Sequence, residues 1–160
     1  MKKLILSHFG LLCILFATTA RAQAPEQARQ FQINTTHTGS ITVPNLTPPL
    51  KQRWAVNFGK SISYPLIADG RVYVTIANGV GLATTLYALD STNGAILWSF
   101  ALGGFSQWSG LCYENGRVFA VNSNGFLRAF DGATGNVIWG VQMPGQSSFN
   151  APPTVYQGVV

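Results

Sequence analysis

Two aspartates, Asp90 and Asp131, are the residues of this sequence whose type and spacing could do chemistry. A pair of carboxylates can serve as general acid and base or can bind calcium, provided that the fold brings the two together. Each aspartate also precedes a turn, and its carboxylate can accept hydrogen bonds from the backbone N–H groups of that turn. Because the two occupy the same place in successive copies of a repeat, we expect them to lie one repeat apart and to stabilise turns.

A histidine and a cysteine are the other reactive side chains to consider. Beyond a leader segment, His37 is the only histidine, so serine–histidine or zinc chemistry would rest on it alone. We interpret His37 as a turn residue. Cys112 lies in an apolar, strand-like run, where a buried and inert thiol is expected. Gly79-Val80-Gly81 lacks the third glycine of a dinucleotide-binding turn, and the sequence has no serine nucleophile elbow.

The elements that must position these residues form a repeat. Segment 86–98 recurs as segment 127–139, with an offset of 41 residues. Both copies have the pattern Ala-x-Asp-x-x-x-Gly-x-x-x-Trp. The motif residues are Ala88, Asp90, Gly94 and Trp98 in the first copy and Ala129, Asp131, Gly135 and Trp139 in the second. The glycine permits a left-handed turn, and the flat tryptophan can cover the seam between neighbouring sheets.

A second element, a β-hairpin, recurs between the copies. Apolar residues flank the turns Asp69-Gly70 and Asn115-Gly116, and a third hairpin is predicted at 154–160. Asp-Gly and Asn-Gly supply the positive φ angles of a type I′ turn. Adding the strands before and after each motif turn gives four antiparallel strands in about 41 residues, the period of a β-propeller blade.

The predicted fold class is therefore all-β, a β-propeller of four-stranded antiparallel blades with about two and a half blades present. The segment around Trp54 aligns with the last strand of a preceding blade. A closed propeller needs at least four blades, so we expect an incomplete propeller, the N-terminal part of a larger one. Open strand edges rich in Val, Ile and Phe would then favour self-association.

The twin motif resembles the pyrroloquinoline quinone (PQQ) type repeat, also called the tryptophan-docking repeat, of quinoprotein-alcohol-dehydrogenase-like proteins. The run from Asn34 to Gly39 is similar to the opening of many secreted members, and the resemblance covers about residues 32–160. It implies a propeller fold but not an activity, because many members are scaffolds or protein-binding propellers. Others are quinone-dependent dehydrogenases, which carry an adjacent cysteine pair, calcium ligands and a catalytic aspartate. No residue of this sequence matches those roles.

Residues 1–22 have the pattern of a cleavable signal peptide. Lys2 and Lys3 precede an apolar stretch, and a small-residue cleavage point follows at Ala22. The expected location is the periplasm or the exterior of the cell, without a stable membrane anchor.

A lipid anchor is not supported, because Leu12 precedes Cys13 where a lipoprotein signal has a small residue. Beyond the signal peptide we predict a lead-in segment at 23–50 and PQQ-like propeller repeats at 51–160.

The charge pattern argues against nucleic acid as a partner. The net charge is +5, with 10 Lys+Arg against 5 Asp+Glu, and the positive residues beyond the leader are scattered along the chain. A protein or glycan partner is expected at the propeller-face loops, whose polar and aromatic residues are Gln107, Trp108, Ser109, Gln146, Ser147, Ser148 and Asn150.

The sequence thus predicts an exported propeller repeat module that acts as a binding or scaffold protein and not as an enzyme. The alternative is the N-terminal part of a PQQ-dependent alcohol or sugar dehydrogenase. We expect no cofactor in the residues given, and PQQ with calcium only under the alternative. A truncated gene product without a function of its own is a third possibility.

Overall fold

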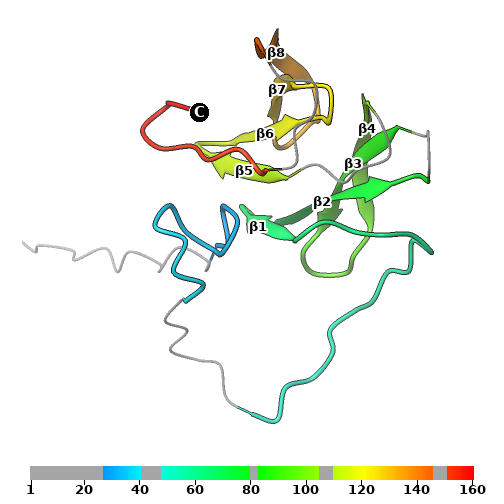
Figure 1. Cartoon of the computed structure of the whole chain (residues 1–160). Helices are drawn as coiled ribbons and strands as arrows, with labels where there is room; N and C mark the ends of the chain where they lie inside the picture. The colour runs from blue at the N-terminus through cyan, green and yellow to red at the C-terminus, as the bar shows by residue number, and fades with distance from the viewer. Residues whose placement is uncertain (1–26, 41–47, 80–82, 105–109, 146–150) are drawn as a thin grey trace, which may run out of the picture.

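The computed structural model describes residues 27–40, 48–79, 83–104, 110–145 and 151–160. Its strands, in chain order, are β1 (Leu66–Ala68), β2 (Arg71–Ala77), β3 (Thr84–Asp90), β4 (Ile96–Gly103), β5 (Leu111–Glu114), β6 (Arg117–Val121), β7 (Phe126–Asp131) and β8 (Val137–Gln142). They form two four-stranded antiparallel sheets, which stand next to each other (Figure 1). Within these ranges, no helix is long and apolar enough to cross a membrane.

The first sheet is a meander in the order β1-β2-β3-β4. The Asp69-Gly70 turn joins β1 to β2 with φ angles of +46° and +74°, as a type I′ turn requires. Strands β2 and β3 then pair from Arg71 opposite Asp90 to Ala77 opposite the first residue of β3. The predicted four-stranded unit is confirmed.

The second sheet, in the order β5-β6-β7-β8, repeats this plan. Its first turn, Asn115-Gly116, has φ angles of +49° and +79°. In both sheets the register shifts immediately after the motif alanine, at Ala88 between β3 and β4 and at Ala129 between β7 and β8. Such an irregularity bends and twists a strand, and its recurrence shows that the two units share the same backbone path.

The two sheets share one hydrophobic core. Its members from the first sheet are Leu66, Ala68, Tyr73, Leu86, Ala88 and Leu102, and those from the second are Leu111, Tyr113, Val118, Ala120 and Phe130. Tyr73 and Phe130 are the largest of its fully buried side chains. Burial of these apolar faces therefore helps to hold one unit against the next.

Two predicted elements differ from the observed structure. Around Gln157 the turn forms, with a φ of +50° and a bridge between Tyr156 and Val159, but no strand extends from it. The segment around Trp54, which aligns with the last strand of a blade, forms no strand, since residues 51–58 have no regular structure. A strand needs a neighbour to pair with its N–H and C=O groups, and the described residues place none beside this segment.

Candidate functional site

Asp90 and Asp131 end β3 and β7, and each stabilises the turn behind its own strand. The Asp90 carboxylate accepts the backbone N–H of Thr92 at 2.7 Å and also the hydroxyl of that residue. The Asp131 carboxylate accepts the N–H groups of Ala133 at 3.0 Å and Thr134 at 2.8 Å. The two aspartates lie in different sheets, so the structure does not bring them together as a catalytic pair.

These hydrogen bonds lower the pKa of both carboxyl groups, because they favour the charged form. The largest cause for Asp90 is the hydroxyl of Thr92, followed by the backbone N–H of the same residue. The largest cause for Asp131 is the backbone N–H of Thr134, followed by its hydroxyl. Both aspartates are therefore ionised turn caps at neutral pH.

A tryptophan of the first unit packs against the motif glycine of the second unit. Trp98 of β4 lies over Gly135, where an added Cβ would stand 2.6 Å from the ring. The indole Nε1 donates to the carbonyl of Gly132 at 3.0 Å, and the buried hydroxyl of Tyr73 donates to the same carbonyl at 3.1 Å. Burial is the main cause that raises the pKa of Tyr73 to about 12, so its phenol remains a donor. The Trp98 ring and the shared carbonyl of Gly132 thus join the two units at this seam.

Trp54 makes the same contact with the first unit, although it belongs to no strand. It lies over Gly94, where an added Cβ would stand 2.7 Å from the ring, and its Nε1 donates to the carbonyl of Ser91 at 2.9 Å. Ser91 and Gly94 hold the same places after Asp90 that the corresponding residues hold after Asp131. The sequence signal for this docking role was the spacing of the tryptophans, not a strand pattern.

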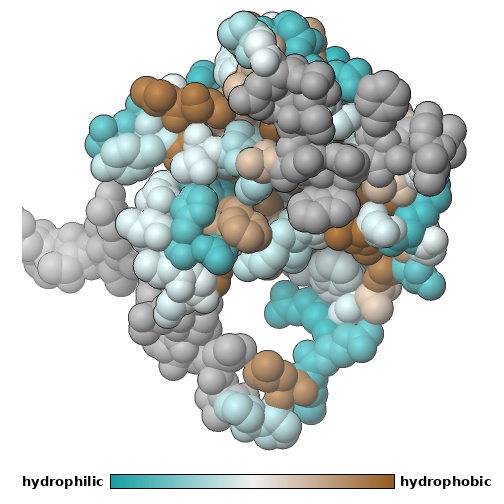
Figure 2. All heavy atoms as spheres, in the orientation of Figure 1, coloured by the Kyte–Doolittle hydropathy of each residue, from teal (hydrophilic) through white to brown (hydrophobic). Residues whose placement is uncertain are grey.

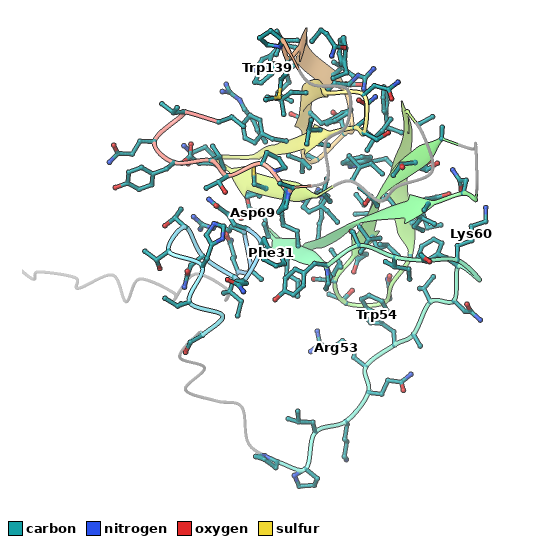
Figure 3. The ribbon with its side chains drawn as sticks, in the orientation of Figure 1. Phe31, Arg53, Trp54, Lys60, Asp69 and Trp139 are labelled. Atoms are coloured by element: carbon teal, nitrogen blue, oxygen red, sulfur yellow. The ribbon has the colours of Figure 1, made fainter. Side chains whose placement is uncertain are left out.

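The remaining motif residues are structural too. Ala88 and Ala129 are fully buried and stand opposite Trp98 and Trp139 in the sheet register. Trp139 is 37% exposed, packs on Phe119 with a ring separation of 6.0 Å, and has no acceptor for its indole N–H among the described residues. Figure 3 shows it on β8, at the end of the molecule remote from the lead-in residues. The repeat motif therefore builds seams, whereas a ligand site has to be sought elsewhere.

The described lead-in residues follow the inner edges of successive units (Figure 1, blue). Ala28 exchanges two backbone hydrogen bonds of 2.8 Å with β1. The carbonyl of Arg29 accepts the N–H of Tyr113 in β5 at 2.8 Å. The side-chain Nε2 of Gln30 donates to the carbonyl of Val155 in the last hairpin. Three consecutive residues thus bind β1, β5 and the last hairpin turn, which are long-range contacts that no local sequence pattern indicates.

A chain of side chains strengthens this attachment. The carboxylate of Asp69, in the first hairpin turn, accepts Nε2 of Gln27 at 2.6 Å and also the hydroxyl of Tyr113. Arg29 in turn donates its Nε to the amide oxygen of Gln27. Burial, followed by the hydrogen bond to Asp69, raises the pKa of the Tyr113 phenol. Figure 3 labels Asp69, in the turn that follows β1, and Phe31, in the lead-in residues.

A cavity of about 390 Å³, which we name the lead-in cavity, lies between the lead-in residues, the end of β5 and the last hairpin turn. Its polar lining includes Arg29, Gln30 and Glu114, and its rim includes Tyr156. Gln30 is only 3% exposed, and its amide oxygen Oε1 has no hydrogen-bond partner. In the view of Figure 2, hydrophilic and apolar residues are interspersed over the coloured surface. A concave space lined by apolar surface and a few polar side chains is the usual form of a ligand site.

Gln30 also lines a smaller cavity of about 180 Å³. Phe31 and Tyr64 form an edge-to-face pair in its wall, with ring centroids 5.7 Å apart, and Leu66 and Leu111 add apolar surface. Gln30 is therefore the one polar side chain that both cavities share, and neither it nor Arg29 was singled out from the sequence.

The other residues considered from the sequence have local roles. His37 has a φ of +54°, as a turn residue would, and its Nε2 lies 3.4 Å from the hydroxyl of Thr154. Cys112 is fully buried, as predicted, and burial raises the pKa of its thiol. The loop residues predicted to bind a partner (107–109, 146–148 and Asn150) lie outside the described residues. Over the described ranges, no group of three or more His, Cys, Asp or Glu side chains could hold a metal ion.

Comparison with known proteins identifies relatives of the repeat. The polyvinylalcohol dehydrogenase of Sphingopyxis sp. (strain 113P3) is 30% identical over 124 residues. That match covers 58% of this chain and 19% of the relative, so the chain spans about a fifth of the relative's length.

Solved structures of low sequence identity share the fold. A europium-containing methanol dehydrogenase superposes with a TM-score of 0.66 at 21% identity, over 83% of this chain and 26% of its own. The quinohemoprotein alcohol dehydrogenase from Comamonas testosteroni gives a TM-score of 0.67 at 19% identity, over 87% of this chain and 23% of its own. The two sheets are therefore β-propeller repeats. The family model PQQ_2, described as outer membrane protein assembly factor BamB, matches residues 49–160, and the chain belongs to this family of propeller repeat proteins.

Proposed function

We propose that this chain is a β-propeller repeat module that binds a partner at the lead-in cavity and serves as a binding or scaffold protein outside the cytoplasm. The observation that carries the proposal is the cavity itself, which combines about 390 Å³ of space with a lining that includes Arg29, Gln30 and Glu114. Cavities of this kind, with a few polar groups set in a rigid frame, are the usual place where proteins bind ligands.

The rigidity of the frame supports a scaffold role. Tryptophan seams fix each unit to the next, and the lead-in residues tie the inner edges together. Loops that connect such units are free to vary in sequence without loss of the fold, which suits recognition. The module recognises its partner through shape and hydrogen bonds and performs no chemistry on it.

The proposed location rests on two observations. Residues 1–22 have the pattern of a signal peptide, and the family model is described by an outer membrane protein assembly factor. We place the module in the cell envelope or outside the cell.

Site-specific photo-crosslinking tests the proposal. A photoreactive amino acid replaces Tyr156, which is 59% exposed at the cavity rim, or Ile96 of β4, which is 54% exposed and distant from the cavity. In intact cells we expect a discrete adduct, with protein or glycan, from position 156 and none from position 96. Equal labelling at the two positions, or no adduct from either, would contradict binding at the cavity.

A second candidate function is part of a quinone-dependent alcohol dehydrogenase. The observation that favours it is the 30% identity with polyvinylalcohol dehydrogenase. Under this proposal the repeat supplies the frame, and PQQ with calcium supplies the oxidising chemistry.

The described cavities do not fit PQQ. The quinone is a planar molecule with three carboxylate groups, so its site needs several cations or N–H donors. Arg29 is the only cation in the linings of the two cavities described above, and the Glu114 carboxylate beside it would repel an acid. No step of an oxidation can therefore be assigned to the described residues.

Titration separates the two functions. The purified protein is titrated with PQQ and calcium by calorimetry, and dye-linked alcohol oxidation is assayed in parallel. Saturable binding with turnover would replace the binding-module proposal with the dehydrogenase. The absence of both heat and turnover is the result we expect.

A further inference from the structure

We propose that the smaller cavity, which has Phe31 and Tyr64 in its wall, is a binding site for a neutral small molecule with one aromatic ring. We name it the aromatic cavity. Its ligand is not the partner proposed for the lead-in cavity, so the inference goes beyond the proposed function. It follows from three properties of the aromatic cavity: its size, a lining without charge, and a pair of exposed rings.

The inner wall of the aromatic cavity belongs to the hydrophobic core. Leu66 of β1 and Leu111 of β5 are both buried, and both line the cavity. Pro152 forms a further side and lies against Gly110, where an added Cβ would stand 2.1 Å from the proline side chain. Because these residues come from both sheets and from the segment before the last hairpin turn, the tertiary fold sets the shape of this wall.

The size of the aromatic cavity limits its ligand to about one ring. Its volume is about 180 Å³. An engineered apolar cavity of about 150 Å³ in another protein binds benzene. A single six-membered ring with a small substituent therefore fits, whereas an oligosaccharide or a peptide is too large.

Two polar side chains of the lining are committed within the protein. The hydroxyl of Ser63 accepts the N–H of Thr75 at 2.9 Å and donates to the carbonyl of Tyr64 at 3.2 Å. Gln30 donates its Nε2 to Val155, and its Oε1 is shielded from solvent. None of the described lining residues is charged. A charged ligand would lose its hydration here without a partner in return, so the site favours a neutral, largely apolar molecule.

The rings of Phe31 and Tyr64 favour an aromatic ligand over an aliphatic one. Their planes meet at 71° with the centroids 5.7 Å apart, which is an edge-to-face pair. Phe31 is 39% exposed and Tyr64 is 46% exposed, so both residues keep accessible surface that a ligand can cover. A third aromatic ring can add stacked or edge-to-face contacts to this pair, which an aliphatic ring of the same size cannot make. The pair therefore supplies selectivity for aromatic molecules.

Fluorine NMR of fluorobenzene, titrated with the purified protein, tests the inference. Toluene and methylcyclohexane are the matched competitors, since they have similar size and differ in the aromatic ring. We expect saturable binding of fluorobenzene and its displacement by toluene. Methylcyclohexane should compete about threefold more weakly or worse, because it makes no ring–ring contact. Benzoate, which carries a charge, should not compete.

Variants locate the binding site. Phe31→Leu and Tyr64→Leu keep an apolar side chain in the wall and remove the ring, and each should weaken the binding of fluorobenzene about threefold. Trp139→Leu is the matched control, because it replaces another partly exposed aromatic residue, in β8 and remote from the lead-in residues. It should leave binding unchanged. Thermal melting of each variant checks that it is folded.

The outcomes separate this inference from the proposed function. The aromatic site is overturned if fluorobenzene does not bind, if toluene and methylcyclohexane compete equally, or if the Tyr64→Leu and Trp139→Leu variants bind equally well. Crosslinking from position 156 reports on the lead-in cavity alone. A crosslink without aromatic binding therefore removes this inference and leaves the binding module, and aromatic binding without a crosslink does the reverse. If neither is found, both fail.

Discussion

Replacement of Gly135 by alanine tests the tryptophan seam between the two sheets. The new Cβ would stand 2.6 Å from Cδ2 and 3.0 Å from Cγ of Trp98, at a backbone φ of +77°. The left-handed conformation costs about 1–2 kcal/mol for a residue with a Cβ. Displacement of the packed ring adds about 1–3 kcal/mol, so the free energy of unfolding should fall by about 2–5 kcal/mol.

Gly116 provides the matched control, since its φ is +79° and an added Cβ would meet nothing within 4 Å. Gly116→Ala should therefore incur the conformational cost alone. The difference between the two variants, about 1–3 kcal/mol, measures the steric conflict with the ring.

Urea unfolding, followed by tryptophan fluorescence and far-ultraviolet circular dichroism, gives both free energies. We expect a lower midpoint at an unchanged slope. In a Trp98→Ala background the ring is absent, so Gly135→Ala should cost no more than Gly116→Ala. The reasoning is refuted if the two glycine variants lose equal stability in the native background, or if the larger loss persists without the ring.

Three further predictions concern titratable and buried groups. The folded-state pKa values of Asp90 and Asp131 lie below the ordinary value of 3.8. The stability that these carboxylates contribute is therefore present above pH 3.8 and is lost as the pH falls through the folded pKa. At pH values under about 4 the melting temperature should decrease, and it should decrease less steeply in the Asp131→Asn variant. Cys112 is fully buried, so its thiol should react with a disulfide reagent at the rate of unfolding, and fast labelling under native conditions would contradict its burial. Tyr113→Phe leaves the ring in the core and removes the hydroxyl group that donates a hydrogen bond to Asp69. The free energy of unfolding, measured from the urea midpoint, should fall by about 1–2 kcal/mol. An unchanged midpoint would show that this hydrogen bond contributes nothing to stability.

The regular part of the fold could be predicted from the sequence because its signals are local. Asp-Gly and Asn-Gly turns with flanking apolar residues define β1, β2, β5 and β6, and the motif around Asp131 defines the strands on either side of it. The segment around Trp54 forms no strand for a physical reason. Its alignment with the last strand of a blade indicates an extended chain, but a strand exists only where a partner takes its hydrogen bonds. Trp54 keeps its docking role because the ring needs only Gly94 and a carbonyl.

The candidate site could not be predicted, because its residues become neighbours only through tertiary structure. Arg29 and Gln30 lie in a segment without periodicity, and nothing nearby marks them as different from other polar residues. Their partners are Tyr113 and Val155, on strand and hairpin residues much further along the chain. The expectation of a polar binding surface on the propeller loops stays a prediction.

The contacts of the lead-in residues have a consequence for the order of folding. Gln30 and Val155 are separated by 125 positions, so the segment that leaves the ribosome early obtains its last hydrogen-bond partner late. Each pair of adjacent strands can form its hairpin as it is synthesised, because hairpins form within microseconds. Closing the loop between Gln30 and Val155 costs more chain entropy than closing a hairpin turn. The two blades should therefore assemble first, and the lead-in residues should dock afterwards as the slow, final step. Until it docks, the inner edges of β1 and β5 are open to other chains, and this is the interval in which a holding chaperone would be of most use.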